Sequence, residues 1–246
     1  QNWQISQIRP EQSQYYFVPP EEMVNAAKKN NSITIAHTYT EPVIFYEYMY
    51  DIGVECKNKS VNNVMISNGY IKTEAMRKLC KYLDAVKIDL KAFTETYYKD
   101  ICVGELKPVL DILQVLKEEG MWFEIVYLMV PTLNDDKSEI SRMADWIVKN
   151  LGTDVPLHFS RFQPLYRLKN LPPTPLKSLE MARDVSMSKG LNYVYIGNVP
   201  GHAAENTFCP KCKKIVVERM GYIIRSIKIK NNKCEYCGEK IPGVWL

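Results

Sequence analysis

Four cysteines near the C-terminus have the spacing of a metal site. Cys209 and Cys212 form one CxxC pair, and Cys234 and Cys237 form a second. A CxxC turn brings two sulfur atoms to one point, and two such turns complete a tetrahedral site of four sulfurs. Residues 201–246 are too few to fold on an apolar core alone, so a bound metal would supply stability. We predict one zinc ion there, and rubredoxin-type iron remains an alternative because it accepts the same ligands.

Polar residues also follow six short apolar runs along the chain. The runs end at Ala36, Ile66, Ile88, Val130, Phe159 and Ile196, and stretches with helical spacing lie between them. This alternation predicts an α/β fold with parallel strands that are apolar throughout and buried on both faces. In a closed or part-closed barrel of such units, chemistry collects at the carboxyl ends of the strands. We therefore expect a single cleft lined by Glu41, Asn68, Asp89, Lys91 and His158.

The residue types at these strand ends allow several kinds of chemistry. Glu41 could accept hydrogen bonds from an ammonium group or a ribose, or it could complement a helix dipole, and the sequence leaves the two readings even. Asp89 and Lys91 could form an ion pair, or Lys91 could be a Schiff-base nucleophile. His158 lies inside its apolar run, as a hydrogen-bonded core histidine would. Arg161 could clamp a carboxylate or phosphate of a substrate in bidentate fashion.

Helices must connect these strands. We expect them over residues 20–29, 42–57, 73–82, 106–119, 137–152 and 176–190, with Asp136 opening a capping box, Gly120 as a C-cap and Thr174-Pro175 as an N-cap. Residues 1–200 would then form a partial parallel (β/α) barrel, and residues 201–246 a small zinc-ribbon-like lobe. The loop over residues 161–173 has three prolines and no periodicity, so it is a candidate lid or binding loop.

Composition sets broad limits. The chain has 246 residues, 46% of them apolar and 24% charged, and a net charge of +4 that permits an anionic substrate or RNA without arguing for either. Paired CxxC cysteines suit metal-binding thiolates in a reducing compartment, so we expect a cytoplasmic protein without a membrane span. Cys56, Cys80 and Cys102 fall in expected helices, where we predict small buried side chains.

The ordered set of strand-end motifs resembles a known family. The segments TYTEP, ISNGY, KIDLKAF, PLHFSRFQP, YVYIGN and CPKC…CEYCG…IPGVW resemble the radical S-adenosylmethionine (SAM) enzymes of the AmmeMemoRadiSam system, which are similar to pyruvate formate-lyase activating enzymes. The resemblance runs across essentially the whole chain. It implies a [4Fe–4S] cluster that cleaves SAM to a 5′-deoxyadenosyl radical, an external electron donor, and a substrate that could be a protein or RNA.

The resemblance also implies roles for individual residues. Thr40 and Glu41 would bind the methionine amino group, while Ser67 and Asn68, which by themselves could be only a turn, would contact SAM at a second strand end. Asp89 and Lys91 would do so at a third, and His158 would also face the cofactor. Because a strand-end residue supports little core, we expect loss of the Glu41 carboxylate to weaken SAM binding more than folding. Ile66 stands where glycyl-radical-activating relatives have an acidic residue, which argues against their cation site.

The cluster motif itself is not in this chain. Family members carry CxxxCxxC directly before a QNW segment, and this sequence starts with Gln1-Asn2-Trp3 and holds no CxxxCxxC. We therefore expect the first barrel strand and the cluster ligands upstream of residue 1, an open sheet edge beside residues 33–37, and residues 1–19 poorly ordered or folded across that gap. The chain alone would then be inactive.

Two other functions remain open. One is a barrel lyase that uses Lys91 as a Schiff-base nucleophile, which borohydride trapping with substrate would reveal. The other is a non-catalytic protein whose ribbon binds RNA or a protein through the stretch from Lys228 to Lys233, although such short basic runs are usually only solvated. A steep salt dependence of RNA binding would favour the latter.

Overall fold

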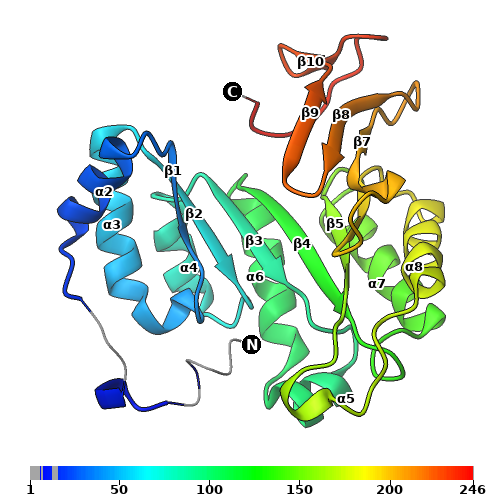
Figure 1. Ribbon diagram of the computed structural model, residues 1–246, viewed down its shortest axis with the longest axis horizontal. Coiled ribbons are helices and arrows are strands. Elements are labelled where there is room, and N and C mark those ends of the chain that lie inside the picture. Colours follow the sequence, from blue (N-terminus) through cyan, green and yellow to red (C-terminus); the bar gives the residue numbers. More distant parts are fainter. Residues whose placement is uncertain (1–5, 7, 13–15, 246) are drawn as a thin grey trace. The chain divides into compact units, whose positions relative to one another are not determined.

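Six parallel strands form the central sheet. The structure is a computed structural model that describes residues 6, 8–12 and 16–245 (Figure 1). The strands are hydrogen-bonded in the order β1-β2-β3-β4-β5-β6, which is also their order along the chain. They are β1 (Thr34–His37), β2 (Asn62–Ser67), β3 (Ala85–Asp89), β4 (Trp122–Met129), β5 (Leu157–Arg161) and β6 (Val194–Gly197). The α/β fold with a parallel sheet is therefore confirmed, and each predicted run corresponds to a strand.

Burial of the strands differs from the prediction. Along β4, buried side chains alternate with partly exposed ones, and β2 shows the same alternation. Successive side chains of a strand point to opposite faces, so one face is closed and the other stays accessible. The expectation of burial on both faces is therefore wrong. The accessible face of β4 carries Glu124, a polar residue that a reading of apolar runs passes over.

The chain divides into two compact units, and the first comprises residues 1–89 and 107–123. It contains β1 to β3 together with α2 (Pro20–Lys29), α3 (Tyr46–Lys59), α4 (Thr73–Cys80) and α6 (Leu106–Glu118). Helices α2 and α3 pack side by side through Val24, Ile52 and Cys56 (Figure 1). Gly53 allows α3 to lie close to its neighbours, because a Cβ there would sit 2.7 Å from the amide nitrogen of Asn63.

The second unit comprises residues 90–106 and 124–246. It holds most of β4, β5 and β6, the short helix α5 (Glu95–Tyr97), the π-helical turn η3 (Tyr98–Cys102), α7 (Lys137–Asn150) and α8 (Leu176–Ser188). It ends in a ribbon of short strands. β7 (Thr207–Phe208), β8 (Ile215–Met220) and β9 (Ile223–Ile227) form one antiparallel sheet, and β10 (Ile229–Lys230) pairs with β11 (Lys233–Cys234). The boundary predicted between residues 200 and 201 stays a prediction.

The helix starts follow the sequence signals only in part. The Asp136 carboxylate caps α7 by accepting the N–H of Glu139 at 2.9 Å, as predicted. The Glu139 side chain does not complete the capping box, since it accepts the N–H of Phe93 and the hydroxyl of Tyr127 instead. Thr174 does not cap α8, which has no side-chain cap. The Thr174 hydroxyl accepts the N–H of Phe162 at 2.8 Å and donates to the carbonyl of Met129, so it ties the segment after β5 to the end of β4.

Strand β1 lies at one edge of the sheet in the described part of the chain, where the sequence predicts an open edge. The expectation for residues 1–19 falls partly on residues 1–5, 7 and 13–15, which lie outside the described residues; Pro10–Gln12 form a short 3-10 turn. None of the helices in the described ranges is both long and apolar enough to cross a bilayer.

Candidate functional site

A hydrogen-bonded corner joins the ends of β1 and β2. Glu41 follows β1, and its Oε1 accepts the hydroxyl of Ser67 at 2.6 Å. Its Oε2 accepts the backbone N–H of Asn68 at 2.9 Å, and Oε1 also takes the N–H of Val43 at 3.3 Å. The half-buried carboxylate thus holds two strand ends together. Thr40, which precedes it, is also half-buried.

The turn after β2 is locked by its own side chains. The Ser67 hydroxyl oxygen accepts the N–H of Gly69 at 3.0 Å, and the Asn68 side-chain oxygen accepts the N–H of Tyr70 at 2.8 Å. Gly69 has a φ of +74°, and a Cβ there would lie 3.2 Å from Ile88. Glycine is therefore required for both conformation and space. The segment is a turn, as its residue types alone allow, and it is also bonded to Glu41.

Asp89 is buried at the end of β3 and forms an ion pair with Lys87, two residues earlier on the same strand face. The sequence analysis did not single out Lys87. The sequence does indicate it: Lys87 stands between Val86 and Ile88, and a lysine between two apolar residues of a strand lies on the opposite, accessible face. Two neighbouring groups of opposite charge therefore line this face of β3.

Lys91 is fixed through its backbone. Its N–H donates to the hydroxyl of Tyr98 at 3.1 Å, and its carbonyl accepts the side-chain amide of Asn134 at 2.7 Å. The same amide donates to the carbonyl of Leu128, and its oxygen accepts the N–H of Val130. Asn134 is fully buried, so it ties the segment after β3 to the end of β4. The sequence analysis missed it because nothing local marks a tertiary contact of this kind.

His158 lies at the second position of β5, not at its carboxyl end. Its Nε2 is 2.7 Å from the Glu124 carboxylate on β4, and its ring stacks on Tyr195 of β6 with centroids 4.7 Å apart. The strand register produces this cluster, since Val126, His158 and Tyr195 are lateral neighbours. Arg161 lies at the end of β5, as predicted, and its Nε donates to the carbonyl of Thr174 at 3.0 Å.

The four ribbon cysteines converge as predicted. Their sulfur atoms all lie within 4.8 Å of one another, with Cys209 to Cys237 at 3.6 Å and Cys212 to Cys234 at 3.8 Å. Metal–sulfur bonds of about 2.3 Å give a tetrahedron with edges of about 3.8 Å, so one metal ion fits. A four-iron cluster, with a separate iron under each sulfur, would need the sulfurs farther apart.

Backbone N–H groups at this site favour the deprotonated form of the cysteine thiols. The N–H of Lys214 is the main cause that lowers the pKa of the Cys212 thiol to about 7. The pKa of Cys209 is raised, chiefly by burial, although the N–H groups of Cys212 and Lys211 oppose that shift. A deprotonated thiol is the form that binds metal, so the lowered pKa of Cys212 favours its role as a ligand.

The three remaining cysteines do not form a second site. Cys56 and Cys80 are buried as predicted, and burial raises the pKa of each thiol to about 11. Cys102 is exposed at the end of the π-helical turn, so its predicted burial is wrong. Over the described ranges, the ribbon cysteines are the only set of three or more candidate ligands that comes together.

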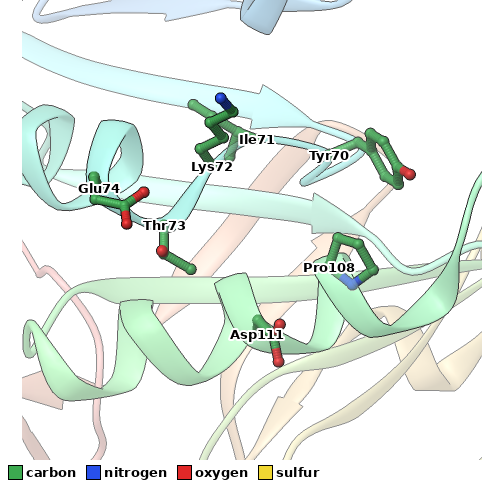
Figure 2. Close-up of a pocket in the computed structure, with 7 residues that line it drawn as sticks. All are labelled: Tyr70, Ile71, Lys72, Thr73, Glu74, Pro108 and Asp111. Atoms are coloured by element: carbon green, nitrogen blue, oxygen red, sulfur yellow. The ribbon is translucent and has the colours of Figure 1, made fainter.

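A shallow pocket of about 370 Å³ lies beside the turn after β2. Figure 2 shows Tyr70, Ile71, Lys72 and Thr73 on one side and Pro108 and Asp111 of α6 on the other. Its lining is mostly apolar, and the Asp111 carboxylate is held by Lys107 at 2.6 Å. The pocket begins two residues beyond Asn68, and it gives the corner an apolar neighbour within the same unit.

Comparison with known proteins decides the family. Residues 1–147 match the family model described as the radical SAM superfamily. The chain is also 44% identical over 248 residues to an uncharacterised protein of Methanocaldococcus jannaschii, covering 99% of this chain and 73% of that protein. The chain belongs to the radical SAM superfamily. It therefore belongs to a class of enzymes.

More distantly related proteins show similarity to parts of this chain. The pyruvate formate-lyase-activating enzyme of Clostridium pasteurianum is 29% identical over 105 residues, which is 43% of either chain. A domain of the corresponding enzyme from Bacteroides vulgatus superposes with a TM-score of 0.59 at 15% identity, over 67% of this chain and 98% of that one. Streptococcus suis SuiB, solved with bound SAM, gives 0.61 at 12% identity, over 76% of this chain and 45% of SuiB. At such identities the structural likeness shows the fold alone.

Proposed function

We propose that this radical SAM protein binds SAM at the corner formed by Glu41, Ser67 and Asn68 and uses it to start radical chemistry on a substrate. The observation that carries the proposal is the bonded junction of two parallel strand ends in a chain of this superfamily. In such enzymes a reduced [4Fe–4S] cluster and SAM together supply a carbon-centred radical that removes a hydrogen atom. This chain's residues would bind and orient the cofactor.

Glu41 acts in two ways in this proposal. Its oxygens already accept from Ser67 and Asn68, which fixes the turn that would contact SAM. A carboxylate offers about four acceptor sites, so a half-exposed Glu41 can also accept an ammonium group. Thr40 flanks it, and Asp89, which belongs to the same unit, would contact the cofactor from the next strand. The predicted roles of Lys91 and His158, which belong to the second unit, stay predictions.

The residues present do not fit the [4Fe–4S] cluster. The chain has no CxxxCxxC motif, the sulfurs of the ribbon are too close together for four irons, and Cys56 and Cys80 are buried on helices. These 246 residues therefore do not supply the ligands of such a cluster by themselves.

Glu124 and His158 form a hydrogen-bonded pair of polar groups on the accessible face of β4 and β5. Both side chains stay partly exposed, at 37% for Glu124 and 27% for His158, so a ligand can reach them. His158 can therefore contact a ligand on this face, with Glu124 setting the orientation of its ring.

The substrate class and compartment are also proposals. Two relatives are named as activating enzymes of a lyase and of a decarboxylase, and SuiB has been solved with a precursor peptide, which supports a protein or peptide substrate here. The four metal-binding thiolates support a reducing compartment such as the cytoplasm. An external electron donor would reduce the cluster.

A direct test compares two versions of the protein, the 246 residues described above and the complete product of the gene. Both are reconstituted anaerobically with iron and sulfide, reduced, and given SAM. We expect cluster absorbance and 5′-deoxyadenosine only from the longer version. An Asn68→Ala variant of that version should retain the cluster and bind SAM more weakly. Product formation by the 246-residue version would refute the assignment of the cluster ligands.

A further inference from the structure

The ribbon exposes an unpaired strand. β9 (Ile223–Ile227) pairs with β8 on one side, and over the described residues no strand pairs with it on the other. The N–H of Lys228 points toward β8, where it bonds the carbonyl of Val216. Inter-strand hydrogen bonds alternate along an antiparallel pair, so the N–H and carbonyl of Ile227 point away from β8. This edge therefore offers backbone groups to another strand.

The side chains of β9 are apolar and open to solvent. Ile223, Ile224 and Ile227 are 59%, 56% and 49% exposed, and Tyr222 at the hairpin tip is fully exposed. Ile223 and Ile224 are consecutive, so they lie on opposite faces of the hairpin. Natural edge strands usually carry charges, prolines or a cover that prevents further pairing. Within β9, Arg225 is the single charged residue.

The surroundings of this edge are strongly basic. Residues 209–246 carry nine Lys or Arg against three Asp or Glu, whereas the whole chain has a net charge of only +4. Arg225, Lys228 and Lys230 are exposed, and none of them has an ion pair with a carboxylate in the described part of the chain. A divalent metal on four thiolates adds two negative charges, which leaves the ribbon positive.

We propose that β9 is a docking edge for an acidic, extended segment of a partner protein, which adds to the ribbon as a further strand. Main-chain hydrogen bonds to the outer edge would give affinity, the isoleucines would pack against alternate side chains, and the cations would select acidic residues. The proposal goes beyond the radical chemistry and does not depend on it.

Two other occupants fit less well. RNA binding without sequence preference stacks successive bases on several aromatic rings, whereas the exposed side chains of β9 itself are branched aliphatic ones. Tyr222 at the hairpin tip is a single exposed ring, and the ring of Tyr236 is in contact with Lys214, whose Nζ lies 4.7 Å from its centroid. A second copy of this chain would bring two basic ribbons together, which like-charge repulsion disfavours.

The test uses the metal-loaded chain and a fluorescein-labelled peptide of about ten alternating glutamate and valine residues, the strand period of two. We expect saturable binding by fluorescence anisotropy. The same peptide with lysine for glutamate should not bind, and one with N-methyl groups along a single edge should bind at least tenfold more weakly. Loss of discrimination between these peptides would overturn the proposal.

A matched pair of variants isolates the backbone contact. Ile227→Pro and Ile227→Ala both remove the side chain, but only proline removes the outward N–H. We expect at least a tenfold loss of affinity for Ile227→Pro and a much smaller loss for Ile227→Ala, with unchanged metal content in both. If the proline variant loses metal, the N-methylated peptide on the unaltered chain decides the question. Arg225→Glu should weaken the acidic peptide by several fold and should not weaken the lysine peptide.

Several outcomes count against the proposal. Tighter binding of labelled oligouridine than of the acidic peptide, insensitive to Ile227→Pro, would assign the surface to RNA. Dimers in sedimentation that Ile227→Pro converts to monomers would assign it to a second copy. Absence of peptide binding at millimolar concentration would leave β9 as an ordinary edge.

Discussion

Glu41 offers a sharp test of how the corner is built. Its carboxylate accepts Ser67 at 2.6 Å and Asn68 at 2.9 Å, with Val43 farther away at 3.3 Å. A hydrogen bond to a charged acceptor contributes about 1.5–3 kcal/mol. Two such bonds to a half-exposed group place the cost of Glu41→Ala at about 3 kcal/mol of unfolding free energy. The sequence-based expectation, that loss of this carboxylate weakens SAM binding more than folding, stays a prediction.

The Glu41→Gln variant refines the argument. Its amide oxygen can still accept the N–H of Asn68, but its amino group must face Ser67. The Ser67 oxygen already accepts from Gly69, so the serine hydroxyl proton loses its acceptor. We expect a smaller cost than for alanine, about 1 kcal/mol, because one bond survives without its charge.

The assay is urea unfolding followed by tryptophan fluorescence, with hydrogen exchange of the backbone amides read in parallel. Glu41→Ala should also speed exchange at Asn68 and Gly69. The matched control is Glu47→Ala, an exposed glutamate in the first turn of α3, which should change stability by less than about 0.5 kcal/mol. If Glu41→Ala matches this control and the Asn68 amide is unaffected, the corner is not held by Glu41.

Three further predictions follow from the geometry. Cys212→Ser should lower the metal content from about one per chain toward zero, and metal analysis with visible absorbance will separate zinc from iron. Asn134→Ala removes three buried hydrogen bonds, to the carbonyls of Lys91 and Leu128 and from the N–H of Val130, and should lower the free energy of unfolding in urea by about 2–4 kcal/mol. An alanine substitution at an exposed position should cost far less. Burial lowers the pKa of His37, so its contribution to stability is present above about pH 6.5 and is lost as the pH falls through the folded-state value. His37→Gln should flatten that loss, by at most about 1.4 kcal/mol per pH unit, and equal slopes for both proteins would contradict the assignment.

The sequence predicted the strands well because each one is a local apolar run. The prediction that both faces of the strands are buried was wrong, because the strands carry polar residues such as Lys87 and Glu124 on one face. Side chains of a strand alternate between its two faces, so a polar residue inside an apolar strand indicates an accessible face, and attention to the apolar residues alone overlooked it. Cys102 was predicted to be a buried side chain on a helix. It lies at the end of a π-helical turn and is exposed.

The candidate site was predictable where its geometry is local. Two CxxC turns fix their own sulfurs, so the metal site followed from spacing alone. The bonds of Glu41 to Ser67 and Asn68 span about one strand–helix–strand unit, and nothing in the sequence near Glu41 names its partners. His158 acquires Glu124 from a neighbouring strand through register, which a single strand cannot specify.

The ribbon is connected to the accessible face of the sheet within the second unit. Arg219 on β8 donates to the hydroxyl of Thr207 at 2.7 Å, and the Tyr195 hydroxyl lies 3.0 Å from the same oxygen. Tyr195 in turn stacks on His158. A metal bound by the four cysteines would order the small lobe and β8 with it, because so short a sheet has little core of its own. Its removal should therefore loosen the contacts that run from β8 through Thr207 and Tyr195 to His158, in addition to the ribbon itself.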